Sequence, residues 1–233
     1  MTPGRGAARP GKSGPSGRVL SALAKEGLLL LSDARLPSIA GLVAKGPVRG
    51  SWWGHPAGQA IFRVSEALAD HPDVVVNRLV SGKVTYVHRR LWPALLAVAR
   101  AGAPWQTRRL SRPARLLLTL LARQGSLRTD RIEGPKHRVS AAARELEDRL
   151  LAHTEWIHTE RGSHARVLVS WDLWARRRGI GGKAGGAARA GEGARGAKEI
   201  LERVVDDLNT RCGADGRLPW QEARPNAAAR LSR

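Results

Sequence analysis

The chain has 233 residues and a formal net charge of +20, because 40 Lys and Arg residues outnumber 20 Asp and Glu residues. An apolar fraction of 42% excludes a wholly disordered chain, and the single cysteine excludes a disulfide framework and a Cys-rich zinc site. No apolar run approaches the ~20 residues that span a bilayer, so we expect no membrane segment.

Changes in composition and periodicity divide the chain into five zones. A disordered basic tail without a secretory signal is expected first, and a flexible Gly/Ala linker is expected after two patterned regions. In chain order the zones are the tail 1–16, the first patterned region 17–104, the second patterned region 105–178, the linker 179–197 and a C-terminal helix and tail over 198–233.

The first patterned region is expected to run helix, strand, short helix, helix, strand, strand and connecting helix. Its opening helix should end at Gly27, because glycine often terminates helices. Apolar residues at helical spacing predict a longer helix over 56–70. Two strands should then alternate around the turn Ser81-Gly82.

The second patterned region repeats this order. Ser111 and Gly125 are typical of the start and the end of a helix, and a second helix is expected over 138–150. Strands follow around a turn at 161–164. This is the element order of a winged helix–turn–helix domain, in which the third helix enters a DNA groove and the hairpin is the wing. We therefore predict a mainly α, α+β chain with tandem winged helix–turn–helix domains plus a C-terminal helix.

The last segment is expected to form an amphipathic helix. Apolar residues at 200, 201, 204, 205 and 208 share one face. Such a face must be buried, either on the body of the chain or on a second copy. A homodimer through the helix at 198–210 is therefore one predicted assembly.

A basic excess in every zone predicts a polyanionic partner, and double-stranded DNA is the first candidate. A GC-rich genome could raise Arg and Ala together, but it would not hold the acidic count to half of the basic count. Groove contacts are expected from helices at 56–70 and 136–145, and wing contacts from 81–83 and 161–166. The candidate DNA-binding residues are Trp52, Trp53, Gln59, Arg63, Lys83, Arg89, Arg90, Lys136, His137, Ser140, Arg144, Arg161, His164 and Arg166.

The segment GSWWGHP at 50–56 departs most from what this fold needs. One tryptophan could stack on an unpaired base, or Trp52 and Trp53 could clamp the two domains together. His55 is the candidate catalytic residue, because a helix N-terminus should lie beside it. His55-Pro56-Ala57 resembles the His-Pro-Ser motif of uracil-DNA glycosylases, whose histidine polarises the base, although the companion Asp-Pro-Tyr-type loop is absent.

Two longer motifs carry a broader resemblance. GSWWGHP and LVSGKVTYVHRRLWPALLAV, at 79–98, resemble a bacterial family of winged-helix proteins, and this resemblance covers about residues 17–175. The tandem arrangement is also similar to that of the winged-helix DNA glycosylases that unhook interstrand crosslinks, but their Gln-x-Gln motif is missing here.

These observations predict a DNA-binding protein of regulation or DNA maintenance. It should lie in the cytoplasm at the nucleoid and need no cofactor. A base-excision DNA glycosylase and a protein–protein assembly module remain as alternatives. No metal is expected, because His153 and His158 differ by an odd number along a strand and so face opposite sides of it.

Overall fold

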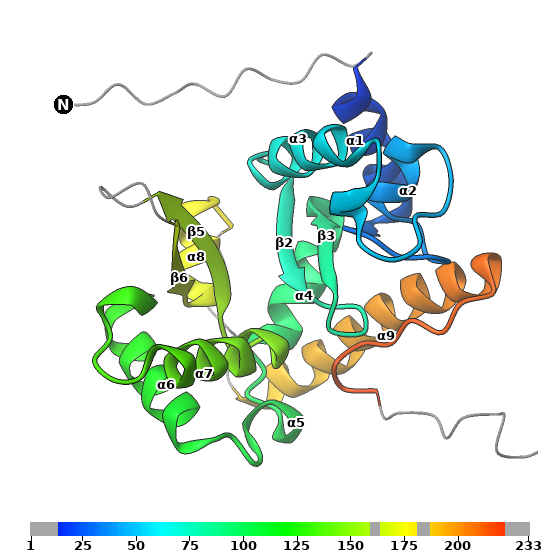
Figure 1. Cartoon of the computed structure of the whole chain (residues 1–233). Coiled ribbons are helices and arrows are strands. Elements are labelled where there is room, and N and C mark those ends of the chain that lie inside the picture. The colour runs from blue at the N-terminus through cyan, green and yellow to red at the C-terminus, as the bar shows by residue number, and fades with distance from the viewer. Residues whose placement is uncertain (1–13, 159–163, 181–186, 222–233) are drawn as a thin grey trace, which may run out of the picture.

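The computed structural model describes residues 14–158, 164–180 and 187–221 (Figure 1). Its first unit consists of helices followed by a three-stranded antiparallel sheet with strand order β1-β3-β2. The elements are α1 (Pro15–Glu26), β1 (Leu28–Leu30), α2 (Ile39–Ala44), the 3-10 turn η1 (Trp52–Gly54), α3 (Gly58–Ala69), β2 (Val74–Arg78) and β3 (Val84–His88).

The second unit repeats this topology, with the sheet order β4-β6-β5. Its elements are α6 (Arg112–Gln124), β4 (Ser126–Arg128), the 3-10 turn η3 (Thr129–Arg131), α7 (Lys136–Asp148), β5 (His153–His158) and β6 (His164–Val169). The predicted α+β fold with two winged-helix-like units and a C-terminal helix is therefore confirmed.

Further helices connect the two units and follow the second one. They are η2 (Arg89–Leu91), α4 (Trp92–Ala99), α5 (Pro104–Thr107), α8 (Trp171–Arg177) and the long C-terminal helix α9 (Ala187–Cys212). Figure 1 shows the first unit, in blue to cyan, and the second, in green to yellow, on either side of α4. None of the described helices is both long enough and apolar enough to cross a membrane.

Local chemistry explains the limits of the best-predicted helix, α6. The Ser111 hydroxyl accepts a hydrogen bond from the backbone N–H of Ala114 at 3.2 Å, which satisfies one of the free donors at the helix start. Gly125 ends the helix with a positive φ of 74°, a conformation that glycine adopts without steric cost. The first helix of the other unit begins at Pro15, inside the predicted tail.

Tryptophans at equivalent positions join the two units. Trp92 lies five residues after Val87, the partner of the first residue of β1, and Trp174 lies five residues after Val169, the partner of the first residue of β4. The two rings meet edge to face with their centroids 5.0 Å apart, and Trp171 packs 5.6 Å from Trp174. All three are buried in one core that both units share.

The C-terminal helix α9 completes this shared core. It packs along α4 and buries Leu201, Val205 and Leu208, so the helix returns to the body of its own chain. The apolar face that suggested a homodimer is thereby covered, and Ile200 is its remaining exposed large side chain. A homodimer through 198–210 stays a prediction, and the apolar face of α9 no longer supports it.

The predicted flexible linker over 179–197 is wrong in its second half. Helix α9 begins at Ala187, and Ala194 and Ala197 are buried. Alanine has the highest helix propensity, and burial adds packing that outweighs the cost of about 1 kcal/mol for each glycine in the helix. Residues 181–186 lie outside the described part of the chain.

Removing a side chain from the contact between α9 and α4 should make the protein easier to unfold. Leu201→Ala should lower the free energy of unfolding by about 2–5 kcal/mol, because it leaves a cavity against α4. Ile200→Ala, one residue earlier on the exposed side, should change it by less than about 0.5 kcal/mol. Urea unfolding followed by tryptophan fluorescence measures both. Equal small effects would show that α9 does not complete the core.

The shared core also buries a neutral histidine. His153 packs against Trp171 and Trp174 with ring centroids 5.5 and 5.8 Å apart. Burial, helped by the nearby Arg178 guanidinium, lowers the pKa of His153 to about 3. The pKa of His153 is thus lower in the folded state than in the unfolded state. The contribution of the neutral imidazole to stability is therefore fully present above the unfolded pKa and is lost as the pH falls toward the folded pKa.

Acid should therefore weaken the fold through His153. Between pH 7 and pH 5 the free energy of unfolding of the wild-type protein should fall by about 2 kcal/mol more than that of His153→Gln. The reason is that in this pH range the imidazole of His153 takes up a proton in the unfolded chain and not in the folded one. Urea titrations of both proteins at the two pH values measure the difference, and His153→Phe repeats the comparison with a second replacement. Identical pH dependence in all three proteins would contradict a buried neutral imidazole.

Candidate nucleic-acid interface

The acidic half of α7 faces the interior of the protein. Glu147 is 8% exposed, and its carboxylate lies 3.7 Å from the guanidinium of Arg78 on β2 of the first unit. Burial raises the pKa of Glu147, although the positive charges of Arg78 and Arg166 oppose the rise. The C-terminal half of α7 therefore packs against the first unit.

The two other acids of α7 also have partners within the fold. Asp148 accepts hydrogen bonds from Arg144 at 2.9 and 3.0 Å. Arg144, a predicted DNA contact, is thus paired with a carboxylate of its own helix. Glu145 accepts the backbone N–H of Ser111 at 3.1 Å and lies 3.7 Å from Arg149. The fully exposed residues of α7 lie in its N-terminal half.

That half carries three of the predicted contact residues. Lys136, His137 and Ser140 are all exposed, and Arg138 is exposed between them. The residue before the helix, Pro135, offers no side-chain cap to the first backbone N–H groups. Free N–H groups and the helix dipole make such an end favourable for a phosphate.

Exposed positive charge runs along the second unit, from the loop before α6 to the start of α7. Within the described residues, eight exposed cations of the unit and the loop before it form no ion pair with a carboxylate. We name these residues the basic face: Arg108, Arg109, Arg112, Arg115, Arg123, Arg131, Lys136 and Arg138. The exposed carboxylate of Glu133 lies among them, and Asp130 is paired with Arg128.

Three of the predicted contact cations of the first unit have partners elsewhere in the fold, whereas Arg63 is exposed on α3. Lys83, at the first wing, forms an ion pair with Asp33 at 2.6 Å. Although burial raises the pKa of Asp33, the hydrogen bonds from Lys83 and from two backbone N–H groups bring it below its usual value. Arg89 pairs with Asp73 at 3.2 Å, and Arg90 donates to the carbonyl of Lys25 at 3.0 Å.

The tryptophan pair lies within the first unit and does not join the domains. Trp52 and Trp53 stack with centroids 4.1 Å apart, and Trp52 packs on a small cluster around Ile61. The clamp interpretation is therefore wrong, and the joining role belongs to Trp92 and its partners. Trp53 is 64% exposed and lies 5.5 Å from the exposed ring of Phe62. Gln59 and Arg63 are exposed on the same helix, α3.

His55 has a local structural partner. Its Nδ1 atom accepts the backbone N–H of Ala57 at 3.1 Å, and α3 begins only at Gly58. The imidazole thus satisfies a donor of the turn that the sequence had suggested as an anion site. In the described part of the chain no hydrogen bond or ion pair links His55 to a carboxylate. Its catalytic role stays a prediction.

The second wing is only partly described. Arg161 lies outside the described residues, as does the side chain of His164, whose backbone starts β6. Arg166 is half-buried and lies over the ring of Trp156, with 5.2 Å from its guanidinium carbon to the ring centroid. Its positive charge opposes the rise that burial causes in the pKa of Glu147. We therefore place Arg166 among the contacts within the second unit.

Sequence reasoning missed an apolar groove in the second unit, between α6 and α7. Its volume is about 1230 Å³, and Leu116 and Leu120 line it while 59% and 37% exposed. The available signal was the count of leucines, because LLLTLL places five of them in six positions. One buried face of a helix cannot accommodate them all.

Comparisons with protein-family models, with curated proteins and with solved structures find no match to this chain. The resemblances noted from the motifs stay predictions. Among the described residues, no group of three or more His, Cys, Asp and Glu side chains could hold a metal ion.

Proposed function

We propose that this protein binds double-stranded DNA through its second unit. The N-terminal half of α7 would enter the major groove, and the surrounding arginines of the basic face would contact the phosphates. The observation that carries the proposal is the basic face of the second unit, which includes Lys136 and Arg138 at the exposed start of α7. Of the predicted contact cations of the first unit, Lys83, Arg89 and Arg90 are engaged within the fold.

The orientation of α7 supports this mode of binding. Glu147 and Glu145 are held against other parts of the protein, and Asp148 is neutralised by Arg144 of the same helix. Its exposed side chains at Lys136, His137 and Ser140 are of types that contact phosphates or base edges. The first unit would then serve as the body that fixes this helix in place.

The glycosylase alternative has one supporting observation. Trp53 is exposed and flanked by Phe62, which suits stacking on an unpaired base. The same hypothesis needs a polar group to act on the base, and the Nδ1 atom of His55 is already engaged with Ala57. DNA binding without base excision therefore remains the stronger proposal.

Replacing two cations at the start of α7 should weaken DNA binding. Lys136→Ala with Arg138→Ala should lower the affinity for unrelated 20-base-pair duplexes about tenfold and reduce the slope of log K against log salt by about one to two units. Both side chains are exposed, so the fold should not change. Fluorescence anisotropy between about 50 and 200 mM salt measures both quantities.

The matched control removes two paired cations of the first unit. Lys83→Ala with Arg89→Ala should leave the affinity within about twofold of the native value. A loss in this control as large as that of the Lys136 and Arg138 pair would move the interface to the first unit. Binding that does not depend on salt would contradict a phosphate-contacting interface altogether.

A further inference from the structure

The two units differ most in the segment that precedes the third helix. In the first unit, residues 31–57 lie between β1 and α3, and they form α2 and η1. Those elements pack on α1 and α3 and bury Ala40 and Ile61. In the second unit only residues 129–135 lie between β4 and α7, and they form the single turn η3.

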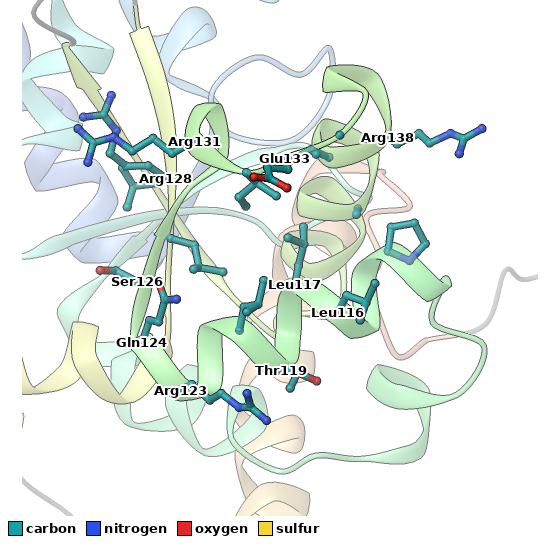
Figure 2. Close-up of a pocket in the computed structure, with 18 of the residues that line it drawn as sticks. Leu116, Leu117, Thr119, Arg123, Gln124, Ser126, Arg128, Arg131, Glu133 and Arg138 are labelled. Carbon is teal, nitrogen blue, oxygen red and sulfur yellow. The ribbon is translucent and has the colours of Figure 1, made fainter.

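Because of this difference, the groove between α6 and α7 of the second unit stays open, whereas α2 packs on the corresponding helices of the first unit. Figure 2 shows Leu116 and Leu117 of α6 between the helices that form the groove, with Arg123, Arg131 and Arg138 at its edges. The apolar lining includes Leu116, Leu117, Leu120, Leu127, Ile132 and Val139. Leu116 is the most exposed leucine of the described chain and gains most from being covered.

Charge surrounds this apolar lining. Arg112, Arg123, Arg131 and Arg138 line the groove, and all four are exposed and belong to the basic face. The carboxylate of Glu133 is the acidic group that lines the same groove. The groove therefore combines an apolar floor with a basic rim, which complements an apolar helix face flanked by carboxylates.

We propose that this groove binds an amphipathic helix of an acidic partner protein, with apolar side chains on Leu116 and Leu120 and carboxylates toward the arginines. A helix is the fitting shape, because α2 occupies the corresponding place in the first unit. The arginines of the rim disfavour the terminal segments 1–13 and 222–233, since both carry more basic than acidic residues. A second copy of this chain, at +20, is disfavoured for the same reason.

Nucleic acid matches the rim but not the floor. A duplex offers phosphates to the arginines and few apolar groups to the leucines, so it would leave Leu116 and Leu120 exposed. The proposal stands on the groove alone and does not depend on the DNA-binding function proposed above. The two can therefore fail separately.

Designed peptides test the proposal directly. The first probe is a fluorescein-labelled helical peptide with leucines at positions i, i+3, i+4 and i+7 and glutamates on its flanks, and the second replaces every glutamate by lysine. We expect the full-length protein to bind the acidic peptide saturably, at least about tenfold more tightly than the basic one. Fluorescence anisotropy measures both affinities. No saturation with the acidic peptide up to about 100 µM, or equal binding of the two peptides, would overturn the proposal.

Variants of two exposed leucines locate the binding site. Leu116→Gln should weaken binding of the acidic peptide at least about fivefold, whereas Leu42→Gln should leave it within about twofold, because Leu42 is 43% exposed on α2 and lies away from the groove. Equal effects of the two variants would place the peptide elsewhere.

Two further measurements distinguish the other occupants. Sedimentation of the wild-type protein and of Leu116→Gln over a range of concentrations should give the same oligomeric state. A dimer that forms in the wild-type protein and is lost in the variant would assign the groove to a second copy. The affinity of Leu116→Gln for duplex DNA should stay within about twofold of the native value. A larger loss would assign the groove to nucleic acid, whereas the Lys136 and Arg138 variant tests DNA binding independently of the leucines.

Discussion

The edge-to-face contact of Trp92 with Trp174 is the interaction on which the arrangement of this protein depends. The two rings come from equivalent places in two similar units, and they bury a common core together with Trp171. Each of Trp92 and Trp171 also donates its ring N–H to a backbone carbonyl, of Val87 and of Leu150. These bonds leave no unpaired donor on either ring, so the rings are fixed in place as well as buried.

Joining the units in this way determines which charges remain for a partner. The C-terminal half of α7 is brought against β2, where Glu147 meets Arg78. Asp148 and Glu145 are engaged by Arg144 and Arg149. Each carboxylate of this helix thus has a cationic partner, and the cations at the start of the helix keep their charge exposed.

The two units have diverged in the use of the same fold. In the first unit a long segment before α3 supplies α2 and the tryptophan pair, and its wing lysine is bound by Asp33. In the second unit a short segment before α7 leaves an open groove and a free helix start. The first unit thus has the character of a scaffold, and the second carries the surfaces that we assign to partners.

Much of this architecture follows from local sequence signals. Ser111 and Gly125 mark the ends of α6 because a capping hydroxyl and a positive φ are local requirements. The tryptophans after both hairpins indicate the repeat. The pairing of Lys83 with Asp33 could not be predicted in this way, because 50 residues separate them and only the folded chain brings them together. The start of α9 at Ala187 was hidden by glycines that tertiary packing overrides.

The candidate site shows the same division. The exposed start of α7 was predicted from its polar residues, and exposure of Lys136, His137 and Ser140 agrees with that expectation. Arg166 was assigned to phosphate because it follows a wing, yet its neighbours Trp156 and Glu147 come from other strands and helices. Periodicity within one strand carries no information on such neighbours.

Hydrogen–deuterium exchange of the native protein with and without a 20-base-pair duplex tests the central claim most directly. The account predicts that the duplex slows amide exchange over residues 112–116 and 136–141, at the starts of α6 and α7, and leaves α3 and the first wing unchanged. Protection confined to α3 and residues 81–83 would contradict it, because the first unit would then be the DNA-binding surface and the second the scaffold.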